Sequence, residues 1–264
     1  MLDTQAGPPS ASSRALLDRV LTGLAGGRPD ARVHSCVGNH CLAAVGRTHL
    51  NARLGVPPPP AAGDHSYYED RLGPGWRLIV LDGYDVSLLG WPATDPRHAA
   101  ASTLLASRNP NPNKNAADGL VGVDRRFVAF GGGVGEEQLA WLESALARAA
   151  SAGDRVVLAI HQALHPDTAP PVCLLWNYDA VLAAVARAGP AVVALTLSGH
   201  AHGDGEATCA AGVRHRVVKA VLETVPGGDA YATLELHGDR VELRGVGVAS
   251  TTVYLPPVGR PAAV

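Results

Sequence analysis

The sequence predicts an α/β fold, a layered sandwich of mixed β-sheets flanked by helices. Segments with the periodicity of strands alternate with segments of helical periodicity between residues 135 and 200, and strand-like segments then follow one another over 214–247. The 264 residues are enough for one large hydrophobic core. We therefore expect a single domain over residues 1–264, with a flexible tail over 248–264.

Three segments predict helices. In 12–26, apolar residues recur at helical spacing after a pair of serines and stop at two glycines. The clearest helix is 135–150, where three leucines share one face and two glutamates occupy the first turn. The third helix, 176–189, ends at a glycine.

Apolar or alternating runs predict the strands. These are 31–37, 76–85, 154–161, 190–200 and 214–224, with a hairpin over 229–247. The segment 56–64 contains a run of prolines and fits the interior of neither a helix nor a strand. Residues 91–133 are expected to be mostly loop, because Asn-Pro repeats and three consecutive glycines interrupt them.

Composition narrows the class of partner and the compartment. The net charge is -2, which gives no basic surface for nucleic acid or an anionic membrane. No apolar run is long enough for a membrane helix, and the N-terminus lacks the pattern of a signal peptide. The four cysteines are spread along the chain with no CxxC pair, which favours a reducing compartment. We expect a cytoplasmic protein with no nucleic-acid or membrane partner. The oligomeric state is not indicated.

Three predicted strands end in polar segments that carry histidine: "CVGNHC", "LAIHQALHP" and "LSGHAHGDG". Sites in open α/β sheets gather at the carboxyl ends of strands, so these segments are expected to converge. The side chains they contribute are Asn39, His40, His161, His200 and His202. Imidazole nitrogens with one amide oxygen suit Mn, Fe, Zn or Ni. Other interpretations stay open: an Asx turn at Asn39, a hydrogen-bonded core histidine at His161, and at His202 a histidine that lies behind the metal ligands or in solvent.

These blocks, in this order, resemble the later signature blocks of the calcineurin-like metallophosphoesterases. Further stretches, among them "RNPNPNKN", "VCLLWNYDAVLA" and "AVLETVPGGDAYATLEL", resemble one branch of that superfamily, the manganese-dependent ADP-ribose/CDP-alcohol diphosphatases. The resemblance runs from about residue 3 to residue 247. It implies a metallophosphoesterase-like sandwich and the metal-dependent hydrolysis of phosphoanhydride bonds. The substrates would be small nucleoside-diphosphate-linked molecules such as ADP-ribose and CDP-alcohols.

The resemblance also implies roles for individual residues. Asn39, His161 and His200 would bind one divalent metal, with manganese favoured over iron or zinc, and His202 would bind a second. His40 would contact the scissile phosphate and protonate the leaving oxygen.

The resemblance extends to a block that begins at Trp176. It suggests that Trp176, Asn177 and Tyr178 contact the nucleoside or ribose, although Trp176 fits the start of a buried helix equally well. His165 lies off the pattern and is expected to be structural or at the rim of the site.

Two departures from the family pattern bear on activity. The opening blocks of the family, Asp-x-Gln and then Gly-Asp, have no counterpart in the sequence, so we expect the first strands to be missing and one metal or none to bind. Cys41 stands where an acid usually orients the preceding histidine, and a thiol is a poor acceptor. The alternative to an impaired hydrolase is a catalytically inactive, metal-binding descendant that acts as an interaction protein.

Overall fold

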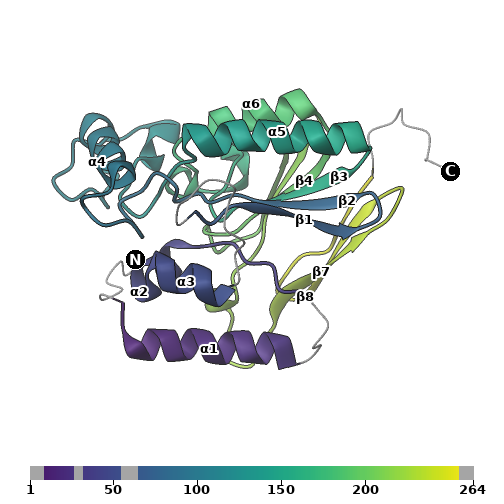
Figure 1. Cartoon of the computed structure of the whole chain (residues 1–264), viewed down its shortest axis with the longest axis horizontal. Coiled ribbons are helices and arrows are strands. Elements are labelled where there is room, and N and C mark those ends of the chain that lie inside the picture. Colours follow the sequence, from purple (N-terminus) through teal and green to yellow (C-terminus); the bar gives the residue numbers. More distant parts are fainter. Residues whose placement is uncertain (1–8, 27–31, 55–64, 256–264) are drawn as a thin grey trace.

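The computed structural model describes residues 9–26, 32–54 and 65–255. Within these ranges, two β-sheets are flanked by helices, as the sequence predicts (Figure 1). The α-helices are α1 (Ala11–Gly26), α2 (Asn39–Val45), α3 (Arg47–Leu54), α4 (Pro96–Arg108), α5 (Glu136–Ala152) and α6 (Tyr178–Ala188). Short 3-10 helices are η1 (Gly122–Arg126), η2 (Pro166–Thr168), η3 (Pro171–Cys173) and η4 (Val221–Glu223). None of the described helices is long and apolar enough to cross a membrane.

The larger sheet has six strands in the order β1-β2-β3-β4-β6-β5. Strands β2, β3, β4 and β6 are parallel, and β1 and β5 pair antiparallel at the two edges. The smaller sheet has the order β7-β8-β9 and is antiparallel. The strands are β1 (Tyr68–Gly73), β2 (Trp76–Val80), β3 (Arg155–Ala159), β4 (Val193–Ser198), β5 (Gly205–Thr208), β6 (Arg214–Val217), β7 (Ala230–Leu236), β8 (Val241–Gly247) and β9 (Thr252–Tyr254).

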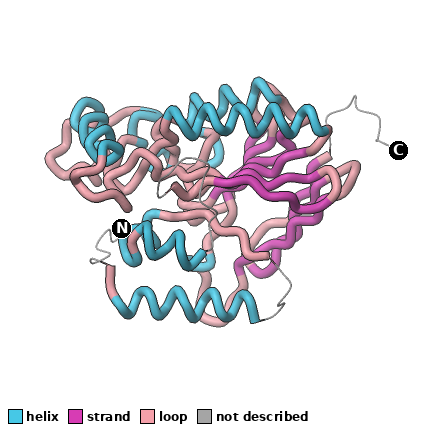
Figure 2. The backbone as a smooth tube through the Cα atoms, in the orientation of Figure 1, coloured by secondary structure: helices cyan, strands magenta, loops and turns pink. Residues whose placement is uncertain are grey.

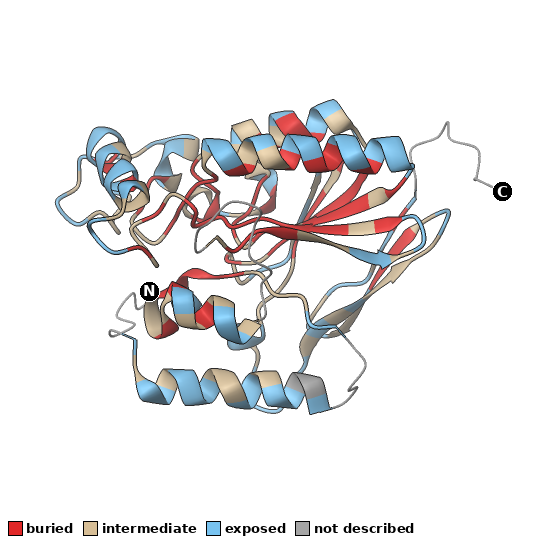
Figure 3. Ribbon diagram, in the orientation of Figure 1, coloured by how far each residue is buried: buried red, intermediate tan, exposed pale blue. Residues whose placement is uncertain are grey.

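Two apolar layers hold the sheets and helices together. Helices α5 and α6 cover one face of the large sheet, and the small sheet packs against the other face. The tube view places α1, α2 and α3 on the side of the large sheet opposite α5 and α6 (Figure 2). Figure 3 shows that the buried residues of α5 and α6 face the sheet and the exposed residues face away. Burial of one amphipathic face per helix accounts for the layered arrangement.

Most predicted elements are confirmed with shifted ends. Helices α1, α5 and α6 and the β7–β8 hairpin match the predicted segments. The strands predicted over 76–85, 154–161 and 190–200 are shorter than expected, because their last residues leave the sheet as polar loops. This shortening matters for function, since the candidate site residues lie in these loops.

The strand predicted over 31–37 is wrong for its described part, residues 32–37. This segment has no strand partner within the described residues, so it makes no ladder of backbone hydrogen bonds. At Ser35 a side chain takes the place of a strand partner. The Tyr68 hydroxyl accepts from the Ser35 N–H (2.8 Å) and donates to the Ser35 carbonyl (3.1 Å).

Three other expectations need correction. The loop expected over 91–133 contains α4, which begins at an Asp95 N-cap followed by Pro96, a start signal that the breaker residues obscured. The strand predicted over 214–224 ends at Val217 and continues as η4. The tail expected over 248–264 contains β9, which pairs with β8. The proline-rich segment 56–64 and residues 256–264 lie outside the described residues.

A buried ion pair fastens α3 to the large sheet. Arg47, the first residue of α3, pairs with Asp82, which lies two residues beyond β2, and both side chains are almost fully buried. The same guanidinium donates to Ser66 Oγ (2.9 Å) and the Tyr84 carbonyl (2.9 Å) and lies 3.9 Å above the Trp91 ring. These contacts fix the α2–α3 segment against the end of β2.

Replacing Arg47 with methionine should lower the free energy of unfolding by about 3–5 kcal/mol, because the buried Asp82 carboxylate then lacks its countercharge. Adding Asp82→Asn should recover part of this loss, since the uncompensated charge is removed. Urea unfolding of the wild type and both variants measures these changes. A loss below about 1 kcal/mol for Arg47→Met would contradict the role of the ion pair.

A buried histidine makes stability depend on pH. Burial, with a smaller effect of nearby His165, lowers the pKa of His215 from 6.5 to about 4. Its ring accepts or donates a 2.8 Å hydrogen bond with Thr196 and stacks on His165. Between pH 6.5 and 4 the unfolded chain binds a proton at this residue and the folded chain does not.

The free energy of unfolding should therefore fall as the pH drops from 6.5 to 4, by on the order of 2–3 kcal/mol from His215. Above pH 6.5 this contribution is constant. His215→Asn removes the titration, so its unfolding free energy should fall less steeply over this range. Urea unfolding at several pH values tests the difference, and identical pH slopes in both proteins would contradict it.

Candidate functional site

Three neighbouring parallel strands deliver polar side chains to one edge of the large sheet. Asp82, His161 and His200 each lie two residues beyond the end of their strand, β2, β3 and β4 respectively. The Gly199 N–H donates to the His161 carbonyl (3.0 Å), which holds the last two loops side by side. This is the edge at which sites form in open α/β sheets.

Three of the predicted side chains meet at this edge. His161 Nε2 lies 3.1 Å from Asn39 Oδ1 and 3.1 Å from His200 Nδ1. Asn39 reaches the histidines from the first turn of α2, which the Arg47 ion pair holds near the sheet. Residues 39, 161 and 200 are far apart in sequence, so the fold alone brings them together.

The donor set fits a divalent metal. A neutral His161 carries at most one proton on Nε2 and cannot donate to two neighbours equally, so hydrogen bonding does not account for the whole cluster. The two 3.1 Å separations bring three potential ligand atoms together at one place, as a shared divalent ion would require. Two nitrogens and an amide oxygen suit manganese, iron or zinc better than calcium.

The electrostatics of the cluster favour neutral imidazoles. Burial lowers the pKa of His161 well below 6.5, and the charges of His200, His40 and His202 add to the effect. Burial, followed by the charges of His202 and His40, lowers the pKa of His200 to about 4. Both rings are therefore neutral near pH 7, with lone pairs available to a cation.

The backbone of the His200–His202 loop is strained. His200 has φ 66° and His202 has φ 62°, and they are the only non-glycine residues in the described ranges with positive φ. Each such conformation costs about 1–3 kcal/mol and persists where the surrounding structure enforces it. The strain coincides with the histidine pair predicted from the "GHAH" motif.

The two remaining predicted histidines are placed differently. His40 is exposed beside Asn39, and His202 is partly buried. Both lie close enough to affect the pKa of His200, but no hydrogen bond in the described part of the chain joins either ring to the three converging side chains. His202 Nδ1 instead lies 2.9 Å from Glu223 Oε1 in η4. Sequence reasoning missed Glu223, although it lies in the "VLETVP" block.

A glycine permits the close packing of the cluster. A Cβ added at Gly38 would lie 2.8 Å from Cε1 and 3.0 Å from Nδ1 of His161. The His161 ring thus covers the backbone that leads into Asn39. Glycine is required at position 38 because a side chain has no space there. Its backbone conformation is not the reason, since a φ of -119° is open to any residue.

The predicted substrate residues make specific contacts within the protein. Trp176 is buried with the α4 residues Ala101 and Leu105. The Asn177 amide pairs with the backbone of Val134, accepting from its N–H (3.0 Å) and donating to its carbonyl (2.7 Å). Tyr178 is partly buried, and Arg126 lies 5.3 Å from its ring.

Two aromatic contacts complete the surroundings of the site. The ring of Phe130, half-buried in the glycine-rich loop, lies 5.8 Å from the ring of His200. Sequence reasoning missed this residue, since the adjacent glycines dominated the interpretation of the loop. His165, expected to be structural or at the rim, stacks on His215.

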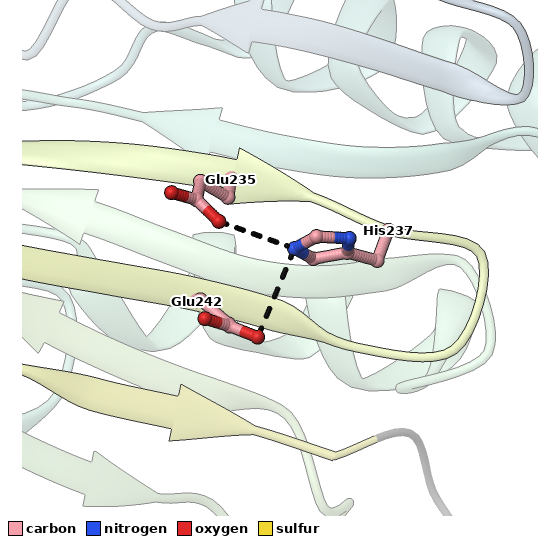
Figure 4. Close-up of side chains that lie close together, drawn as sticks. All are labelled: Glu235, His237 and Glu242. Atoms are coloured by element: carbon pink, nitrogen blue, oxygen red, sulfur yellow. Dashed lines mark ion pairs between the residues drawn. The ribbon is translucent and has the colours of Figure 1, made fainter.

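A second cluster of metal-ligand type lies in the β7–β8 hairpin (Figure 4). His237 Nε2 is 3.4 Å from Glu235 and 3.8 Å from Glu242. Arg240 pairs with Glu242, and Arg244 pairs with both glutamates. The two arginines already neutralise the two carboxylates, so a cation would have to displace them. We interpret this cluster as an ion-pair network that stabilises two glutamates facing each other across the strands.

Comparisons with known proteins give relatives over most of this chain. The chain is similar to the manganese-dependent ADP-ribose/CDP-alcohol diphosphatase of Oryza sativa subsp. japonica, at 41% identity over 82% of this chain and 66% of the relative. It is also similar to the diphosphatase of the same name from Arabidopsis thaliana, at 37% identity over 84% of this chain and 70% of the relative. The relative from Xenopus tropicalis is 32% identical over 92% of this chain and 74% of its own length. This chain thus spans about two thirds of the length of the plant relatives it matches.

A solved structure shows the same fold. The crystal structure of a dimetal phosphatase from Danio rerio superposes with a TM-score of 0.86 at 32% identity, covering 93% of this chain and 78% of that one. A scan against protein-family models gives no match. The predicted metallophosphoesterase-like architecture is confirmed by the superposition. On the similarity to the diphosphatases over most of its length, the chain belongs to the family of manganese-dependent ADP-ribose/CDP-alcohol diphosphatases.

Proposed function

We propose that this protein is a manganese-dependent diphosphatase that hydrolyses the phosphoanhydride bond of small nucleoside-diphosphate-linked molecules, such as ADP-ribose and CDP-alcohols. The observation that carries the proposal is the 3.1 Å convergence of Asn39, His161 and His200 at the carboxyl edge of the sheet. The names of the relatives supply the substrate class and the metal.

Each site residue has a task in this proposal. Asn39, His161 and His200 would hold one divalent ion, in line with the one metal expected from the sequence, and His202 alone would hold a second ion only weakly. When bound, the metals supply positive charge that stabilises the phosphoryl oxygens in the transition state. The neutral state of His161 and His200 allows them to act as ligands without first losing a proton.

His40 acts on the leaving group. Its ring is exposed beside Asn39, where a substrate can reach it, and in the proposal it contacts the scissile phosphate and protonates the leaving oxygen. The next residue, Cys41, provides no carboxylate to orient the ring. We infer that His40 is held less firmly than it would be beside an acid, so that turnover is reduced.

The substrate is proposed to lie against the wall formed by 130–133 and 176–178. Trp176 is 2% exposed and packs against α4, which fits the alternative of a buried residue at a helix start, so Asn177 and Tyr178 are the residues proposed to contact the nucleoside or ribose. Phe130 adds an aromatic face next to His200. A small nucleotide-linked molecule is the expected partner, with no nucleic acid involved.

We also propose that the chain works as one domain in the cytoplasm. The cluster that includes Leu78, Val157, Leu243 and Tyr254 joins the two sheets in one core, which supports a single unit. All four cysteines are free, which supports a reducing compartment.

The first test measures release of the products of ADP-ribose hydrolysis with and without Mn²⁺. We expect Mn²⁺-dependent turnover by the wild type. His161→Ala should reduce it by more than the roughly 10–100-fold that loss of an outer partner of a ligand costs. The matched control is His237→Ala, which removes a histidine from the ion-pair network of the hairpin and should leave turnover unchanged. A wild type that binds Mn²⁺ without hydrolysing ADP-ribose or CDP-alcohols would instead support a non-catalytic, interaction-based function.

The second test uses Gly38→Ala. The added Cβ would overlap the His161 ring, so the ring must move away from Asn39 and His200. Affinity for Mn²⁺, measured by the EPR signal of the free ion, should fall about 10–100-fold, with a loss of about 1–3 kcal/mol in unfolding free energy from overpacking.

Gly23→Ala in α1 is the control for this test. Nothing lies within 4 Å of a Cβ added at that position, so neither quantity should fall. Unchanged Mn²⁺ affinity in Gly38→Ala would show that the position of the His161 ring does not matter for the metal.

A further inference from the structure

The contact between His202 and Glu223 joins the candidate site to a segment that the metal ligands do not include. His202 Nδ1 lies 2.9 Å from Glu223 Oε1, while the other ring nitrogen, Nε2, makes no hydrogen bond within the described residues. The His202 side chain is 18% exposed and that of Glu223 is 55% exposed. Glu223 therefore contacts the ring from the solvent side.

The backbone sets up this contact. The Ala220 N–H donates to the His202 carbonyl (3.1 Å), which ties the start of η4 to the histidine loop. Asp204, two residues after His202, accepts from the Lys219 N–H (3.0 Å) and pairs with Arg216 of β6 (3.0 Å). These bonds hold the 200–204 loop against residues 216–223, and they help to maintain the left-handed backbone at His202.

A carboxylate at one ring nitrogen determines which tautomer a neutral histidine adopts. Glu223 can only accept, so His202 places its proton on Nδ1 and leaves a lone pair on Nε2. Histidines that bind metals commonly donate their second N–H to a carboxylate in this way, which fixes the ring and makes it a stronger ligand.

We propose that Glu223 is a positioning residue, which holds His202 in the tautomer and orientation that present Nε2 to a divalent metal. The inference rests on the proposed function, in which His202 is a metal ligand. The negative charge of Glu223 also offsets part of the charge of the metals, because Asn39, His161 and His200 are all neutral ligands.

An ordinary surface ion pair would have different consequences. A partly exposed His–Glu pair that served only the fold would stabilise it by about 0–1 kcal/mol and would leave the affinity for metal unchanged. The experiments therefore measure the tautomer and the metal affinity, together with the unfolding free energy.

The first experiment records the side-chain nitrogen chemical shifts of His202 by NMR in metal-free protein near pH 8. The wild type should show a protonated Nδ1 and an unprotonated Nε2. Glu223→Ala should shift His202 toward the Nε2–H form, and Glu223→Gln, which keeps an acceptor oxygen, should restore the wild-type tautomer. The same tautomer in wild type and Glu223→Ala would overturn the proposal.

The second experiment measures Mn²⁺ affinity by EPR in His202→Ala, Glu223→Ala and the double variant. Glu223→Ala should weaken the His202-dependent binding about 10–100-fold, with Glu223→Gln intermediate because it lacks the charge. In the double variant, Glu223→Ala should add nothing to the loss caused by His202→Ala. Leu222→Ala, in the same 3-10 helix and 68% exposed, is the matched control and should bind as the wild type does.

The outcomes separate this inference from the proposed function. If the wild type binds no Mn²⁺, or if His202→Ala binds it normally, the metal role of His202 and the proposal for Glu223 both fail. If His202→Ala loses affinity and Glu223→Ala does not, only the proposal for Glu223 fails.

Discussion

The candidate site depends on the buried ion pair between Arg47 and Asp82. The sheet alone brings His161 and His200 together, because they follow adjacent parallel strands. Asn39 comes from a different segment, and the Arg47 guanidinium fastens that segment to the end of β2. Removing one partner of a buried pair leaves an uncompensated charge, so α2 cannot leave the sheet without a large cost. The ion pair thus holds the segment that carries Asn39 next to the two histidines that the sheet already brings together.

Without a cation, the cluster of Asn39, His161 and His200 lowers the stability of the folded chain. Two imidazoles are buried with their nitrogens 3.1 Å apart, and the loop that carries His200 and His202 holds two non-glycine residues in the left-handed region. Both features cost free energy without improving the packing of the core. A divalent ion would give His161 Nε2 and His200 Nδ1 a shared partner, and Glu223 supplies a carboxylate on the outer side of His202.

Much of this arrangement could be predicted from the sequence, because periodicity and strand-end histidines are local patterns. The convergence of His161 and His200 follows from the rule for strand ends, whereas Asn39 joins them from the first turn of α2, because residues 32–37 form no strand. The segment 32–37 could not be predicted correctly, because alternation indicates a strand only when a neighbour exists to pair with it. Glu223 was also missed, because its contact depends on how η4 folds back onto the His202 loop. Side chains that support a ligand from another segment leave no local signal.

The most direct test of the account is the position of manganese in a crystal of the Mn²⁺-soaked protein, located by its anomalous scattering. The account predicts a peak within bonding distance, about 2.1–2.3 Å, of Asn39 Oδ1, His161 Nε2 and His200 Nδ1. A structure with no peak there would contradict it. So would a peak only at the hairpin cluster of Glu235, His237 and Glu242, because that would place the metal among groups that we assign to an ion-pair network.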